Sequence, residues 1–141
     1  MKILSAEQIR AADRYTIEHE PVASIDLMER AAGACTKWLL TEKFSPLVQG
    51  KLIKDKVNFF CGTGNNGGDG LAIARMLLKK NIPVSIFIIP LGNQPTKDFL
   101  INKNRLEKLS LKSITEITSA KELPRLNKSD VVVDALFGTG I

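Results

Sequence analysis

The 141-residue sequence contains few of the side chains that most often build redox, metal or nucleophilic sites: its cysteines are Cys35 and Cys61, and its single histidine is His19. Two cysteines do not make a disulfide framework. His19 lies between two glutamates, and a lone histidine in such a polar segment is more typical of the surface than of a catalytic or metal site. We expect Cys35 to be a small core residue and Cys61 to be a buried, inert thiol, because no histidine lies near it in the sequence.

The sequence also lacks a long apolar segment. No run approaches the roughly 20 apolar residues that a helix needs to cross a bilayer, and the N-terminus has no apolar core behind a basic start. With 44% hydrophobic and 25% charged residues, the composition is typical of a soluble globular protein. We therefore expect a cytoplasmic protein with no membrane partner.

Basic residues exceed acidic ones by 20 to 15, giving a net charge of +5 and a pI of about 9.3. The lysines fall mostly in segments expected to connect elements, at 51–56, 79–80 and 103–112, with no aromatic residues among them. This pattern is more typical of solvated faces than of a nucleic-acid interface, so we expect no nucleic-acid partner. A general attraction for a polyphosphate ligand is compatible with it.

Glycine is concentrated in one stretch, with five glycines between positions 62 and 70. The apolar run at 57–60 predicts a strand before it, and the helical spacing of apolar residues at 71–78 predicts a helix after it. Glycines let main-chain N–H groups approach a ligand closely, and a helix N-terminus supplies further donors. This stretch therefore predicts a site for an anion, and a phosphate is the anion we expect.

Two well-known nucleotide loops do not match this stretch. No Asp or Glu occurs between Asp69 and Asp98, although the usual dinucleotide fingerprint wants an acidic residue about 20 positions after its glycines. The turn also lacks the lysine of a P-loop. It carries instead three oxygen-bearing side chains among its glycines, those of Asn65, Asn66 and Asp69.

The remaining segments alternate between helical and strand patterns. Ser5 and Gln8 have the form of a capping box, which predicts a helix from there to about residue 18, and Ser24 is expected to cap a second helix. We expect a loop at 44–55, strands at 57–60, 84–89, 113–117 and 130–137, and further helices at 96–109 and 120–126. This order predicts an α/β fold with a Rossmann-like, doubly wound, mainly parallel sheet and two N-terminal helices.

In such a sheet, ligands bind at the carboxyl ends of the strands, where the strand order reverses. The glycine turn after residue 60 and a second one at 138–140 both emerge at this edge, so we expect them to lie side by side. Asp134 should point toward the same site as a buried carboxylate in need of a partner, for which a hard cation is a candidate. A loop-fixing or capping role explains Asp134 about as well. A structural role is also an alternative for Asp69, because a carboxylate in the first turn of a helix is stabilised by the helix dipole.

Three segments together resemble a known family. Gly-Asn-Asn-Gly-Gly-Asp-Gly at 64–70, Asp-Ala-Leu-Phe-Gly-Thr-Gly at 134–140 and Ile-Asp-Leu-Met-Glu-Arg-Ala-Ala at 25–32 are similar to the NAD(P)H-hydrate epimerase family, the N-terminal epimerase domain of the bifunctional NAD(P)H-hydrate repair enzyme. The resemblance implies an isomerase that interconverts the R and S forms of hydrated NADH or NADPH.

The resemblance also implies roles for individual residues. The substrate would be held by Asn65, Asn66, Gly67, Gly68 and Asp69, and its phosphates would meet Gly138, Thr139 and Gly140. A potassium ion would be bound by Asn66 and Asp134. Asp134 is the candidate for acid/base catalysis as well, and the sequence leaves open which of its two roles applies.

The resemblance bears on organisation too. The sequence ends on a glycine turn with no helix after it, so we expect one partial Rossmann-like domain over residues 1–141, incomplete at its C-terminal side, with the helices at 5–43 as an N-terminal extension. Dimerisation through these helices is implied by the family. The alternative to an active epimerase is a non-catalytic module that binds a nucleotide or metabolite.

Overall fold

The computed structural model describes residues 4–43, 56–90, 92 and 94–138. The elements, in chain order, are α1 (Ala6–His19), α2 (Ser24–Trp38), η1 (Leu39–Lys43), β1 (Val57–Cys61), α4 (Asn65–Leu78), β2 (Val84–Ile88), α5 (Lys97–Ser110), η2 (Leu111–Ser113), β3 (Ile114–Glu116), η3 (Ala120–Glu122) and β4 (Val131–Ala135). The expected loop at 44–55 lies outside the described residues.

The strands form one parallel sheet in the order β3-β2-β1-β4. β1 is central, and its Val57, Phe59 and Cys61 side chains have no exposed surface. Because β4 joins on the far side of β1 from β2, the strand order reverses between β1 and β4. The α/β fold class predicted from the sequence is confirmed.

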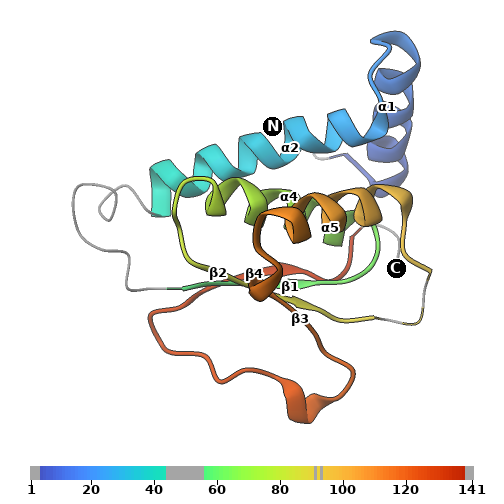
Figure 1. Ribbon diagram of the computed structural model, residues 1–141. Helices are drawn as coiled ribbons and strands as arrows, with labels where there is room; N and C mark the ends of the chain where they lie inside the picture. The colour runs from blue at the N-terminus through green and yellow to red at the C-terminus, as the bar shows by residue number, and fades with distance from the viewer. Residues whose placement is uncertain (1–3, 44–55, 91, 93, 139–141) are drawn as a thin grey trace.

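The helices are layered on the sheet (Figure 1). α4 and α5 cover one face, α2 lies on top of them, and α1 projects from the end of α2 at the edge where β1 and β4 end. The connection from β3 to β4, which contains η3, runs past the other face. This crossing to the opposite face accompanies the reversal of strand order, as in a doubly wound sheet.

α4 begins at Asn65, six residues earlier than the apolar spacing indicates, so Gly67, Gly68 and Gly70 are helical. A Cβ on Gly67 would lie 1.8 Å from the carbonyl oxygen of Gly62, and one on Gly70 would lie 2.7 Å from the Cβ of Ala135. The first turns of α4 therefore press directly against the ends of β1 and β4. Most of these glycines serve contact between chain segments rather than contact with a ligand.

Several local expectations are wrong. The expected helix at 120–126 is only the short 3₁₀ turn η3, because Pro124 follows it and lacks the N–H that would continue a helix. Cys35 is exposed rather than in the core. The N-cap of α2 is Ala23, and the Ser24 hydroxyl instead donates to Asp98 Oδ2 over 2.6 Å.

Other expectations are confirmed. Ser5 and Gln8 form the capping box of α1. Cys61 is buried, and its burial raises the pKa of the thiol to about 12, which makes it inert. His19 is exposed, and its ring stacks on that of Tyr15.

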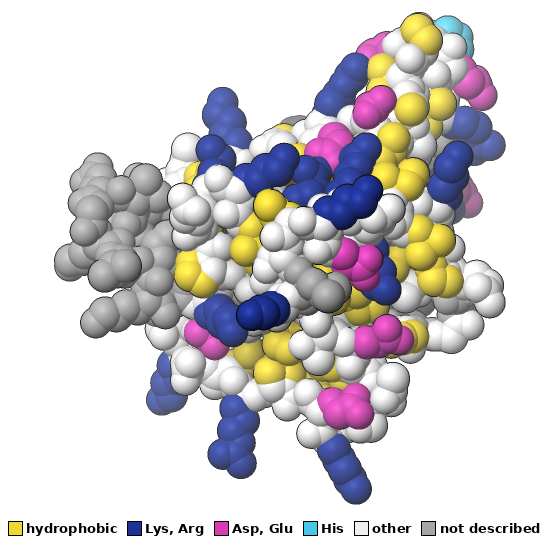
Figure 2. Space-filling model, viewed as in Figure 1, with side chains coloured by type: hydrophobic (Ala, Val, Ile, Leu, Met, Phe, Trp, Pro, Cys, Tyr) yellow, Lys and Arg dark blue, Asp and Glu magenta, His cyan; other side chains and the backbone are white. Residues whose placement is uncertain are grey.

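The described surface carries mixed charges. Lys and Arg side chains are spread over several parts of the face in Figure 2, interspersed with acidic and hydrophobic ones, rather than gathered in one stripe. Among the described residues, no helix has the length and apolar character needed to cross a membrane.

Candidate functional site

The first glycine turn meets the segment that follows β4, as far as Gly138, beside the ends of β1 and β4. The Gly62 amide donates to the Ala135 carbonyl over 3.0 Å, and the Asn66 side-chain amide donates to the Phe137 carbonyl over 2.8 Å. Gly138 lies against Asn66, since a Cβ added to Gly138 would be 3.2 Å from the Cβ of Asn66. The first turn of α4 and the segment after β4 therefore line one edge, at the position where the strand order reverses.

Gly64 is the glycine of this turn that suits an approaching ligand. It is the N-cap of α4, no side chain caps the helix there, and nothing lies within 4 Å of where its Cβ would be. The first amides of a helix have no intrahelical partner and carry a partial positive charge. An anion such as a phosphate fits against this bare helix start.

Asp134 is exposed, so the expectation of a buried carboxylate is wrong. Along β4, Val132 and Asp134 are exposed and alternate with the less exposed Val131, Val133 and Ala135, of which Ala135 packs on α4. Asp134 therefore lies on the sheet face opposite α4. Its Oδ1 accepts a hydrogen bond from the Leu136 amide over 3.0 Å, which fixes the start of the second turn.

A pocket of about 430 Å³ opens at the same edge, between α1, α2 and the start of α4. It is lined by Arg10, Asp13, Arg14, Ile17, Ser24, Leu27, Met28, Ala31, Asn65 and Asp69. Its volume is within the range of small-molecule sites. Of the residues predicted to hold substrate, Asn65 and Asp69 face this pocket, whereas Asn66 contacts the segment after β4.

Asp69 is partly buried in this pocket. Desolvation, followed by the negative charges of Asp13 and Asp98, raises the pKa of its carboxyl from 3.8 to about 6. Since α4 begins at Asn65, Asp69 lies beyond the first turn of the helix. The helix dipole is therefore a weaker explanation for this carboxylate than the sequence suggests, because its effect falls off within the first turn.

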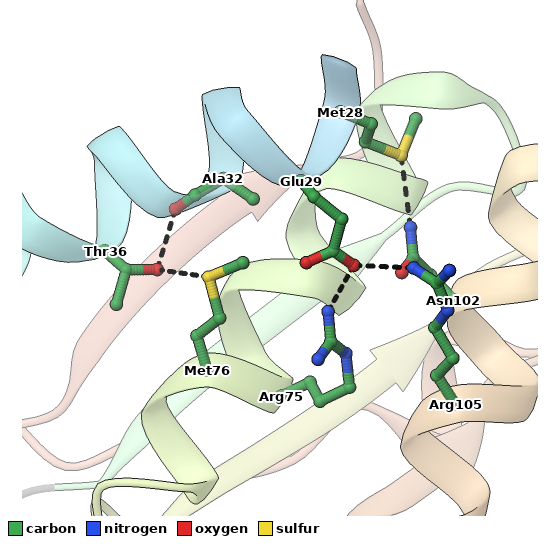
Figure 3. A network of polar contacts seen from close by, with 8 residues as sticks. All are labelled: Met28, Glu29, Ala32, Thr36, Arg75, Met76, Asn102 and Arg105. Carbon is green, nitrogen blue, oxygen red and sulfur yellow. Dashed lines mark hydrogen bonds and ion pairs between the residues drawn. The ribbon is translucent and has the colours of Figure 1, made fainter. Parts of the chain in front are cut away.

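The wall that α2 contributes is held by a polar cluster (Figure 3). The Glu29 carboxylate on α2 pairs with Arg75 on α4 and, over 2.8 Å, with Arg105 on α5. Beside it, the side-chain amide of Asn102 donates to the Met28 sulfur over 3.1 Å. The Glu29 cluster fixes α2 across both underlying helices. α1, by contrast, has no buried residue.

The remaining predicted site residues are placed as follows. Gly67 and Gly68 are buried inside α4, with the backbone of Gly62 or the side chain of Met28 next to them. Thr139 and Gly140 lie outside the described residues. Sequence reasoning did not single out Arg10, Asp13 and Arg14, although their spacing places them on one side of α1.

Comparison with known proteins decides the family. A family model described as YjeF-related protein N-terminus matches residues 24–141. The chain belongs to this family. The turn at 62–70, the segment after β4 and the α2 wall of the pocket all lie within the matched range.

Relatives of the YjeF-related N-terminal domain carry informative names. The chain is 36% identical over 138 residues to a protein of Oenococcus oeni named NAD(P)H-hydrate epimerase, covering 98% of this chain and 60% of that protein. It is 39% identical over 140 residues to a protein of the same name from Limosilactobacillus reuteri, covering 99% and 60%. It is also 32% identical over 144 residues to the Bifunctional NAD(P)H-hydrate repair enzyme Nnr of Moorella thermoacetica, covering 99% and 26%.

The same fold occurs in a solved structure. The crystal structure of yeast ynu0, YNL200c, superposes on this chain with a TM-score of 0.81 at 23% identity, covering 100% of this chain and 58% of that one. At this identity the likeness concerns the fold alone. The chain spans about 60% of the length of the epimerases that it matches.

Proposed function

We propose that this domain is the core of an epimerase that interconverts the R and S forms of hydrated NADH and NADPH, in repair of the nicotinamide cofactor. The names of relatives at 36% and 39% identity support this activity. The single observation that carries it structurally is the hydrogen bond from Asn66 to the Phe137 carbonyl, because it joins the two glycine turns into one binding edge.

A dinucleotide fits the features of this edge. Its pyrophosphate would lie against the uncapped start of α4 at Gly64 and against Gly138. The family resemblance adds Thr139 and Gly140 to the residues proposed to meet the phosphates. Asn65 and Asn66 would hold the nucleotide through their amides. Epimerisation needs the hydroxyl to leave the reduced ring with the help of the ring nitrogen and to return from the other side, which requires a firmly held substrate and a proton donor.

Potassium is the cofactor we propose, held by Asn66 and Asp134. The ion would lie at the strand ends, which Asn66 reaches from the α4 side through its contact with Phe137 and which Asp134 approaches from the opposite face of β4. The chemistry of the donors fits, since an amide oxygen, a carboxylate and nearby backbone carbonyls are all oxygen ligands suited to a hard cation. The Asn66 amide nitrogen donates to Phe137, so its oxygen is the atom available to an ion. Bound there, the cation would offset the negative charge of the phosphates and order the second turn.

We also propose a homodimer through the N-terminal helices and a cytoplasmic location. α1 has no buried residue, and its Ile9 and Tyr15 are 39% and 63% exposed, which supports an apolar contact with another chain. Sedimentation before and after deletion of residues 1–20 tests the dimer. A dimer that survives the deletion contradicts this assignment.

The activity is tested by incubating the chain with the separated R and S hydrates and following their ratio by chromatography. Equilibration faster than the spontaneous rate supports the epimerase. Binding without acceleration supports the second candidate, a module that binds the nucleotide or metabolite without turnover. Asp134→Ala should abolish most of the acceleration, and an unchanged rate would remove Asp134 from the site.

A further inference from the structure

The pocket between α1, α2 and α4 contains a carboxyl group to which the proposed function gives no chemical task beyond binding. Asp69 reaches this pocket from the second turn of α4. We propose, on the basis of the proposed function, that the hydrated nicotinamide ring binds in this pocket. Asp69, rather than Asp134, then transfers the proton that lets the hydroxyl of the ring leave.

The position of the pocket suits one end of a dinucleotide. Asn65 and Asp69, four residues apart, both line it. Asn66, which follows Asn65 in the chain, instead contacts Phe137 after β4. The uncapped helix start at Gly64 directly precedes both Asn65 and Asn66 in the chain. A pyrophosphate at the helix start would therefore have the two ends of the molecule directed toward the pocket and toward the second turn.

The walls of the pocket suit a ring with an anionic tail. Leu27, Met28 and Ala31 of α2 and Ile17 of α1 supply apolar surface, while Arg10 and Arg14 of α1 supply positive charge. Binding sites typically combine such a mainly apolar lining with a few polar groups that fix the orientation. α1 is therefore a wall of the substrate site as well as a candidate for contact between chains.

The ionisable groups around Asp69 keep its proton available. α1 presents Arg10, Asp13 and Arg14, and α5 presents Asp98, while the pocket residues of α2 carry no ionisable side chain. Burial and the nearby Asp13 and Asp98 carboxylates raise the pKa of Asp69 to about 6, despite the two arginines. A group with such a pKa is suited to give and take a proton near neutral pH.

Asp134 has a different environment from Asp69. It is exposed, it does not line the pocket, and its Oδ1 accepts a hydrogen bond from the Leu136 amide over 3.0 Å. An exposed carboxylate tied to the backbone is suited to hold a cation and order a turn. The two acidic residues of the site thus divide into a cation ligand and a proton donor.

The reaction balances without any further reactant. In the first step the proton of the Asp69 carboxyl goes to the hydroxyl oxygen, the bond from ring carbon to oxygen breaks, and water leaves while the ring-nitrogen electron pair forms an iminium bond. In the second step a water oxygen bonds to the other face of that carbon. The iminium electron pair returns to nitrogen, and the proton that water loses passes through solvent to the Asp69 carboxylate.

Asp69→Asn removes the proton donor while keeping the shape of the side chain. We expect kcat for epimerisation to fall at least a hundredfold, as is usual for loss of a general acid, with KM changed by only a few-fold. The wild-type rate, corrected for the spontaneous rate, should decrease above about pH 6, and the residual rate of the variant should not follow that profile. The matched control is Asp130→Asn, which changes a carboxylate just before β4, at the opposite end of that strand from the site, and should leave kcat and KM unchanged.

A second measurement covers the case in which the variant does not fold. The carboxyl carbon of Asp69 in the isotope-labelled wild-type chain can be followed by NMR during titration with the S hydrate of NADH. We expect its signal to move and its pKa to change on saturation. A signal that stays in place overturns the inference, whether or not the chain is active.

The two proposals fail in different ways. A wild-type chain that does not accelerate epimerisation contradicts the proposed function. An active wild-type chain together with an equally active and folded Asp69→Asn variant contradicts only the assignment of Asp69. Loss of activity in Asp134→Ala that is recovered with added potassium supports the division of roles between the two carboxylates.

Discussion

A Cβ atom on Gly70 would lie 2.7 Å from the Cβ of Ala135 and 2.9 Å from the sulfur of Cys61, so α4 lies directly on the ends of β1 and β4. Real Cβ atoms do not approach so closely, and both neighbours are fully packed. Gly70→Ala should therefore lower the free energy of unfolding by about 1–3 kcal/mol, the usual cost of an overpacked core, even though alanine favours helix. Urea denaturation measures the change.

Gly33→Ala is the control for this substitution. Gly33 also lies inside a helix, α2, but nothing lies within 4 Å of its added Cβ. The free energy of unfolding of this variant should rise by up to about 1 kcal/mol, since alanine is the better helix former. Equal effects at the two positions would contradict the close contact of α4 with the sheet.

Glu29→Gln should destabilise the fold, because Glu29 is the carboxylate partner of Arg75, which is only 8% exposed. Removing one partner leaves the other charge buried without compensation, and we expect a loss of about 2 kcal/mol in thermal or urea unfolding. Glu107→Gln is the matched control. Its ion pair with Lys103 spans 3.4 Å on the surface of α5, and such pairs contribute about 0.3–0.5 kcal/mol.

Much of the fold follows from the sequence, because its signals are local. The apolar runs at 57–60 and 84–89 match β1 and β2 within a residue, and the Ser5 capping box marks the start of α1. Alternation of these elements is enough to predict a parallel sheet and a site at its carboxyl edge. The same alternation predicts that the two turns lie side by side, and the contact between Asn66 and Phe137 agrees with this prediction.

What the sequence did not predict depends on contacts between distant segments. The helix start at Asn65 was missed because glycines argue against helix locally, while their close packing on Gly62 and Ala135 is a tertiary effect. The pocket was missed for the same reason. α1 and α4 are about fifty residues apart in the sequence, and nothing in either segment indicates that Asp13 lies near Asp69.

The raised pKa of Asp69 predicts a pH dependence of stability. A pKa of about 6 in the folded protein, against an ordinary value of 3.8, means that the folded state binds the proton more tightly than the unfolded state. The resulting stability is fully present below about pH 4 and is lost as the pH rises through 6. Asp69→Asn does not titrate, so it should become more stable relative to wild type across this window, by about 1–2 kcal/mol after allowing for partial exposure.

Asp130→Asn should change stability with the opposite dependence on pH. Hydrogen bonds from the Asn127 backbone lower the pKa of the Asp130 carboxyl, so its contribution is present above its ordinary pKa and is lost as the pH falls. The difference in the free energy of unfolding between wild type and this variant should therefore shrink in acid.

Guanidinium unfolding at a series of pH values measures both the Asp69→Asn and the Asp130→Asn variants. A wild-type advantage over Asp69→Asn that grows between pH 4 and 7 would contradict the desolvated state of Asp69.

Potassium should stabilise the folded chain if Asn66 and Asp134 bind it. A ligand that binds only the folded state adds about 1.4 kcal/mol at ten times its Kd, which for a domain of this size raises Tm by a few degrees. The informative quantity is the Tm in potassium chloride minus the Tm in lithium chloride at equal ionic strength, because Asp134→Ala also removes the bond to the Leu136 amide and lowers Tm in every salt. This difference should vanish in Asn66→Ala and Asp134→Ala but persist in Asn104→Ala, a substitution at an exposed amide on α5. A potassium effect of equal size in all these proteins would place the ion elsewhere and leave Asp134 with the loop-fixing role alone.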